Sequence, residues 1–178
     1  MADNYTVIPA RLRISRSSSL ALTTSWQVVD FSGTSPYNVN TFAYDSSIGK
    51  NLVYWDSTSK LIKFSSSYDM NLITSLFATT STNLLTTKAT VQVRFVIPNG
   101  VSPGVDLYFP YPDETTPYAD LGEVTLLANG IKHQPLILPI YANSSMRTNG
   151  FRVEIRLSNS LITLGTCSLN SCTLSIQQ

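Results

Sequence analysis

Residues 89–98 read ATVQVRFVIP, and this stretch decides the fold. Its apolar residues recur at every second position with polar residues between them: Ala89, Val91, Val93, Phe95 and Ile97 alternate with Thr90, Gln92 and Arg94. A β-strand places two such sets on opposite faces, one buried and one wet. The pattern returns at Phe151–Leu157, where Arg152, Glu154 and Arg156 are the polar positions. One-sided strands of this kind are typical of antiparallel sheets, so the sequence predicts a β-sandwich or barrel.

The composition argues against several classes of function. A chain of 178 residues is long enough for one domain with a sizeable core. Charged residues make up 13%, against roughly 25% in an average protein, and the net charge is +1. A near-neutral chain is not expected to bind nucleic acid, because such binding needs a basic face. No apolar run approaches the length that spans a bilayer, and the N-terminus has no basic start followed by an apolar stretch, so we expect neither membrane insertion nor a secretory signal.

From residue 20 onward the chain is a series of short strand candidates between turn residues. Asn-Gly occurs three times and suits tight hairpin turns, and LVYWD and LIKF (residues 52–56 and 61–64) suggest a further hairpin. Helix is expected at most as one short turn over residues 69–76, within a region that also fits a strand at 72–77. The pattern favours an antiparallel two-sheet jelly roll, with an up-and-down barrel and an immunoglobulin-like sandwich as alternatives.

Residues 1–20 differ from the rest and are predicted to be an extended attachment arm, with the sandwich domain at residues 21–178. A proline follows apolar residues, and three arginines fall within six positions. The residues predicted to bind a partner are Val7, Ile8, Arg11, Leu12, Arg13 and Arg16. The alternative is that this segment is an edge strand of the same domain.

No catalytic, metal or cofactor site is expected. The single histidine, His133, has no Gly-x-Ser-x-Gly serine to work with. The acidic residues Asp113, Glu114 and Asp120 match no calcium loop and fit a polar turn. Cys167 and Cys172 could form a disulfide if they face each other across a tight hairpin loop, or they are two free thiols.

The aromatic segment DLYFPYPDETTPY (residues 106–118) is a candidate recognition loop. Tyrosine and proline in a loop give rigid contact area that suits a protein or sugar partner. The residues predicted for this surface are Tyr108, Tyr111, Asp113, Glu114 and Tyr118. The alternative is that these aromatic side chains cover the open end of the sandwich.

The order of segments resembles the tumour-necrosis-factor-like and complement-type globular jelly rolls, and particularly those of tailed-phage structural proteins. The residues that carry the resemblance are TSWQVVDF, YNVNTFAY, LVYWDSTSKLIKF, ATVQVRFVIPNG, LILPIY and NGFRVEIRLSN, in that order between residues 24 and 178. The resemblance lies in a pattern of strands, so no functional residue is carried over. It implies a homotrimer packed through aromatic and aliphatic strand faces, used in phages as capsid decoration or at fibre tips.

The sequence therefore favours a non-enzymatic virion protein: a trimeric cement or decoration knob that binds the major capsid protein, or another virion protein, through its arm. It would be made in the host cytoplasm and displayed on the particle. A receptor- or glycan-binding fibre knob is the alternative. A shell-forming capsid protein is less favoured, because the arm is far less basic than genome-packaging arms are.

Overall fold

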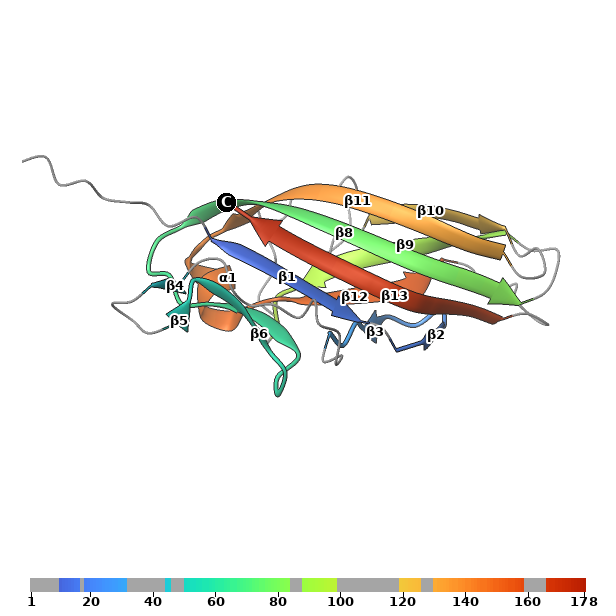
Figure 1. Ribbon diagram of the computed structural model, residues 1–178, viewed down its shortest axis with the longest axis horizontal. Helices are drawn as coiled ribbons and strands as arrows, with labels where there is room; N and C mark the ends of the chain where they lie inside the picture. The colour runs from blue at the N-terminus through green and yellow to red at the C-terminus, as the bar shows by residue number, and fades with distance from the viewer. Residues whose placement is uncertain are drawn as a thin grey trace, which may run out of the picture.

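A computed structural model describes residues 10–16, 18–31, 44–45, 50–83, 88–98, 119–125, 130–158 and 166–178. Nearly all regular structure in these residues is antiparallel β-strand, as the alternation at residues 89–98 predicted. Figure 1 shows the long strands β1, β13, β8 and β11 side by side in one layer, with β9, β10 and β12 behind them.

Two sheets form the sandwich. Sheet A has the order β1-β13-β8-β11, and β2 also pairs with β13. Its strands are β1 (Arg11–Arg16), β2 (Leu20–Leu22), β8 (Met70–Asn83), β11 (Gly130–Ala142) and β13 (Thr166–Gln177). Sheet B has the order β10-β9-β12-β3, with β3 (Gln27–Val28), β9 (Lys88–Val96), β10 (Ala119–Thr125) and β12 (Arg152–Leu157). The strands β1 and β13 pair, and the chain crosses repeatedly between the two sheets, as in a jelly roll: β2 to β3, β8 to β9, β10 to β11, β11 to β12 and β12 to β13 each change sheet.

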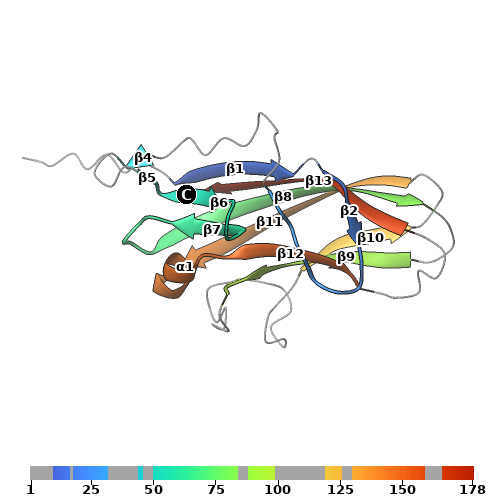
Figure 2. The same cartoon turned by 90° about the horizontal axis from the view of Figure 1, so that it is seen from below.

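The core lies between the two sheets, where Figure 2 places β9 and β12 below β1 and β13. Every second residue of β9 points into it, and Val91, Val93 and Phe95 have no exposed surface. The ring centres of Phe95 and Phe151 lie 5.3 Å apart. The two segments whose alternation predicted the fold therefore meet in its core. The strand order does not distinguish jelly-roll families, and the tumour-necrosis-factor-like assignment stays a prediction.

The smaller elements gather at one end. The hairpin of β6 (Val53–Asp56) and β7 (Leu61–Phe64) is confirmed, with Trp55 paired to Ile62. A second short pair is β4 (Tyr44–Asp45) with β5 (Lys50–Asn51). The helix α1 (Ser144–Asn149) was not expected from the sequence. Its N-terminus is capped by Asn143, whose side chain accepts hydrogen bonds from the backbone N–H groups of Ser145 and Met146.

Two possibilities that the sequence left open are not realised. Residues 70–83 form one strand, so the helical turn over residues 69–76 is absent, because Leu72, Leu76 and the residues between them alternate between core and surface along β8. The hairpin loop between Cys167 and Cys172 is also absent, because both lie within β13. Both thiols are free and buried, which confirms the free-thiol alternative. Burial raises the pKa of Cys167 to about 11 and that of Cys172 to about 12, so both stay protonated at neutral pH.

The described part of the predicted arm is an edge strand. Arg11–Arg16 pair with β13 in continuous register, and Leu20–Leu22 pair with the same strand. Leu12 and Ile14 are each 2% exposed and belong to the core. The predicted boundary at residue 20 therefore falls within sheet A, and an arm outside the sandwich is restricted to residues 1–9, which the structure does not describe.

Candidate interaction surface

The outer side of sheet A carries exposed apolar side chains. Where the structure describes side chains of β8 and β11 (residues 70–82 and 133–142), even-numbered residues face the core and odd-numbered residues face outward. Ile73, Phe77 and Ile137 are 48%, 45% and 68% exposed. Pro135 pairs with Phe77 and Pro139 with Ile73 across the two strands. We call these five residues the apolar face. Large exposed apolar side chains gathered on one sheet are typical of protein–protein contacts.

The surroundings of the apolar face are neutral. Among the outward side chains that the structure describes on β8, β11 and β13, none is an acid, a lysine or an arginine. The outward residues of β13 beside the face are Thr173, Ser175 and Gln177. The exposed Arg11 and Arg13 lie beyond them on β1, opposite Gln177 and Ser175. A partner can therefore cover β8, β11 and β13 without burying a charge from these positions.

The outer side of β8, β11 and β13, which contains the apolar face, has dimensions that suit a protein partner. β8 and β11 pair over 13 residues, which at about 3.4 Å per residue gives a length of about 44 Å. Three strands at about 4.8 Å spacing give a width of about 14 Å, and hence roughly 600 Å². Stable interfaces bury about 800 Å² per partner, so the outer side of these three strands, with the apolar face at its centre, is of the right order.

His133 lies at one end of this face. Its ring stacks on Phe77 at 5.7 Å with an angle of 14° between the rings, and Thr79 Oγ1 lies 3.0 Å from His133 Nδ1. These contacts orient the histidine as part of the surface. In the part of the chain that the structure describes, no cluster of three or more His, Cys, Asp or Glu side chains could hold a metal ion.

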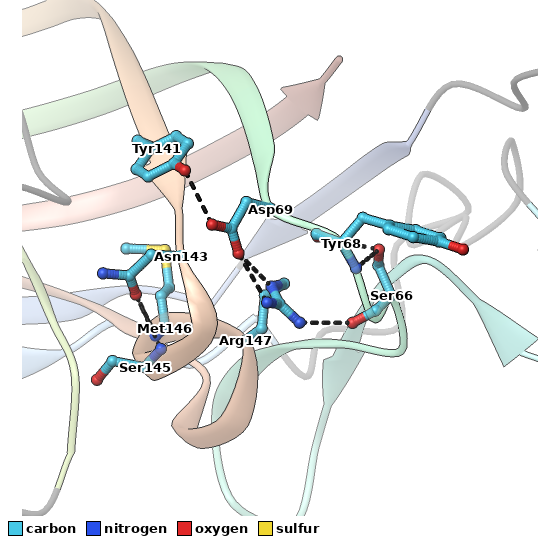
Figure 3. A network of polar contacts seen from close by, with 8 residues as sticks. All are labelled: Ser66, Tyr68, Asp69, Tyr141, Asn143, Ser145, Met146 and Arg147. Carbon is cyan, nitrogen blue, oxygen red and sulfur yellow. Dashed lines mark hydrogen bonds and ion pairs between the residues drawn. The ribbon is translucent and has the colours of Figure 1, made fainter.

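A polar network closes the other end of the face, where β11 leads into α1 (Figure 3). Asp69 accepts hydrogen bonds from the Tyr141 hydroxyl at 2.8 Å and from Arg147 Nη2 at 2.7 Å. Arg147 Nη1 also donates to the backbone carbonyl of Ser66 at 3.2 Å. Arg147, and then Tyr141, lower the pKa of Asp69 below its ordinary value. The network fixes the segment between β7 and β8 to the helix.

Next to this network Tyr68 projects into solvent, with 78% of its surface exposed. Its backbone is held by the Ser66 hydroxyl, which accepts a hydrogen bond from Tyr68 N at 3.0 Å and donates to Tyr68 O at 3.1 Å. Nothing in the sequence marks this tyrosine as a surface residue, because it stands alone after three serines.

The charged side chains that the structure describes on β9 and β12 of sheet B already have partners within the chain. Glu154, 4% exposed, accepts hydrogen bonds from Arg94 Nε at 2.8 Å and from Arg152 Nε at 2.7 Å. Arg152 and Glu154 are therefore paired within the chain. Arg156 instead donates to Gln92, and the Arg94 and Arg156 guanidinium carbons each lie 4.3 Å from the centre of the Trp26 ring. These contacts tie β3, β9 and β12 together.

The predicted arm residues divide into four groups. Val7 and Ile8 lie outside the described residues. Arg11 and Arg13 are exposed on β1, whereas Leu12 is buried and unavailable to a partner. Arg16 donates from Nη1 to the carbonyl of Asp30 at 3.0 Å and from Nε to that of Ser18 at 2.9 Å, so it fixes the segment after β1.

The predicted recognition loop lies outside the described residues. Tyr108, Tyr111, Asp113, Glu114 and Tyr118 all fall in the undescribed segment 99–118. Their role in binding stays a prediction.

The apolar face was missed in the sequence, although a signal was present. The segment LILPIY (residues 136–141) has apolar residues at consecutive positions and does not alternate. In an antiparallel sheet, a strand that is apolar on both faces is covered on both. The lack of alternation in this segment therefore indicates that its outward face is also covered.

No protein-family model matches the sequence, and no curated protein is similar to it. Among solved structures, the PRD1 vertex protein P5 is similar with a TM-score of 0.48 and 13% sequence identity, over 94% of this chain and 70% of that chain. At this identity and TM-score, no argument about function rests on the likeness. No helix in the described ranges is long and apolar enough to cross a membrane.

Proposed function

We propose that this chain is a non-enzymatic virion structural protein, a homotrimeric capsid decoration protein of a tailed phage. The observation that carries the proposal is the apolar face. Ile73, Phe77 and Ile137 together with two prolines present a neutral, apolar surface. Exposure of such a surface to water is unfavourable in free energy. Copies of the chain that pack against one another through this face remove it from water.

Attachment to the capsid uses the start of the chain. Arg11 and Arg13 are exposed at the beginning of β1, directly after residues 1–9. Their guanidinium groups form charge-assisted hydrogen bonds to carboxylates of the major capsid protein. Three arms in one trimer bind at high effective concentration, so weak single contacts suffice.

Substitution of Ile137 by aspartate tests the proposal. The intact protein should sediment at about three times 19.6 kDa. Ile137→Asp should give monomers, because an unpaired carboxylate would be buried in each interface. Thr24→Asp, at an exposed position outside the face, is the matched control and should stay trimeric. A monomeric wild-type protein, or a trimeric Ile137→Asp variant, would contradict the assignment.

A glycan-binding fibre knob is the alternative, and Tyr68 favours it. An exposed aromatic ring on a fixed turn is a surface on which a sugar ring can stack. A glycan array and a particle-binding assay separate the two functions. A decoration protein should bind phage particles that lack it and should bind no glycan. A fibre knob should bind a glycan, and its Tyr68→Ala variant should not.

A further inference from the structure

The strand β11 forms one edge of sheet A. It pairs with β8 over 13 residues, and no described strand lies on its other side in the sheet. An edge of this length offers a row of backbone donors and acceptors to any other chain that can add a strand. The question is what controls strand addition at this edge.

Pro135 and Pro139 occupy positions in β11 that pair with Phe77 and Ile73. Proline has no backbone N–H, so it fits a paired strand only where its nitrogen points away from the partner. The register continues through both positions without a shift. The odd-numbered residues of β11 therefore direct their backbone groups to the free edge, since these directions alternate along an antiparallel strand.

Two hydrogen bonds support this direction. The carbonyl of Tyr141, an odd-numbered residue, accepts a hydrogen bond from the backbone N–H of Asn143 at 3.2 Å. The carbonyl of Leu138, an even-numbered residue, accepts one from Thr74 Oγ1 of β8 at 2.8 Å. The carbonyl of Tyr141 thus accepts its hydrogen bond on the side away from β8, whereas the carbonyl of Leu138 faces β8.

We propose that Pro135 and Pro139 close the β11 edge against a second copy of this chain. The outward donors that remain are the N–H groups of Ile131, His133, Ile137 and Tyr141. From His133 onward they are four residues apart, whereas an antiparallel partner needs one at every second residue. Two β11 strands paired antiparallel about Ile137 would also place Pro135 of one copy opposite Pro139 of the other. Both rings then stand where a carbonyl must approach.

The same two residues thereby select the mode of association. Their rings lie on the apolar face, where they add surface for a partner that packs against the sheet. Their missing N–H groups block the edge of the same strand. Copies that could associate through both the apolar face and the β11 edge would not form a closed assembly. Such open-ended contacts produce fibres or networks. Closing the edge leaves the face as the route to a finite assembly.

The double variant Pro135→Thr/Pro139→Thr restores both donors and favours the strand. In sedimentation velocity it should form species larger than the wild-type assembly, and their share should grow with protein concentration. Pro98→Thr, outside β11, is the matched control and should sediment as the wild type does. A folded double variant with the wild-type size distribution at all concentrations would overturn the proposal.

Hydrogen exchange tests the same geometry in the unaltered protein. The amide of Ile137 should exchange about a hundredfold or more faster than the amides of Leu136 and Leu138, which bond to β8. Equal protection of all three would show that the edge is paired, and the proposal would be wrong. This outcome is distinct from failure of the proposed trimer, which is read from the mass of the Ile137→Asp variant.

Discussion

At the scale of single residues, Gly150 is the position where the backbone conformation most restricts which amino acid can be present. It ends α1 with φ 71° and ψ −176°, a conformation that is essentially confined to glycine. Its N–H donates to the carbonyl of Met146 at 2.7 Å, and Phe151, which follows it, exchanges two backbone hydrogen bonds with Ile62. The glycine thus joins the helix to the core through one sharp change of direction.

Gly150→Ala should lower the free energy of unfolding by about 2–3 kcal/mol, the cost of an L-residue in this region of backbone space. A Cβ there would lie 2.7 Å from the backbone carbonyl oxygen of Ile62, which cannot move without breaking its bond to Phe151. Urea denaturation measures the loss. Thr148→Ala, exposed in the same helix, is the control, and an equal effect from both variants would contradict the explanation.

The sequence predicted single residues well where periodicity alone decides burial. Phe95 and Val153 were assigned to the core from alternation, and both have no exposed surface. Gly150 was identified only as part of an Asn-Gly turn signal, because the sequence does not show that Asn149 ends a helix. That helix depends on Arg147 and Asp69, which are far apart in the chain and meet only in the folded protein.

At the scale of elements, β1 shows where composition misled. Three arginines and a preceding proline suggested a detached arm, yet Leu12 and Ile14 alternate between them as in the other strands of sheet A. Alternation over six residues is a short signal, and the arginines dominated the interpretation. β11 shows the opposite case, since its strand was predicted but its second apolar face was not.

Two truncations should separate the arm from the strand. Removal of residues 1–9 should leave stability unchanged and weaken attachment to particles, because it deletes the arm and keeps the contacts of Arg11 and Arg13. Removal of residues 1–16 also deletes Leu12 and Ile14 from the core. The burial of each side chain is worth about 1.5–3 kcal/mol. Since a whole domain is stable by about 5–15 kcal/mol, the longer truncation should unfold at much lower temperature.

Thermal unfolding and co-sedimentation with particles are the measurements for these truncations. The shorter truncation serves as the control for the longer one. Full decoration of particles by the protein without residues 1–9 would exclude the arm as the attachment segment. A melting temperature unaffected by loss of residues 1–16 would mean that β1 contributes little to sheet A.

At the scale of the whole molecule, the charged and apolar contacts are separated. The apolar face on β8 and β11 is neutral in its described positions, and the exposed Arg11 and Arg13 stand on β1 at the other edge of sheet A. Sheet B directs Arg94 and Arg152 onto Glu154. The fold therefore offers one surface governed by burial of apolar area and another governed by charge.

Salt should distinguish these two surfaces in one experiment. Raising the salt from about 0.1 M to about 1 M shortens the Debye length from about 10 Å to about 3 Å, which weakens contacts between exposed arginines and carboxylates. Apolar burial is not screened in this way. We therefore expect the protein to leave the particles at high salt and to remain trimeric in solution, as measured by co-sedimentation and by sedimentation velocity in parallel. A trimer that dissociates over the same salt range as the particle complex would show that charged groups also hold the copies together.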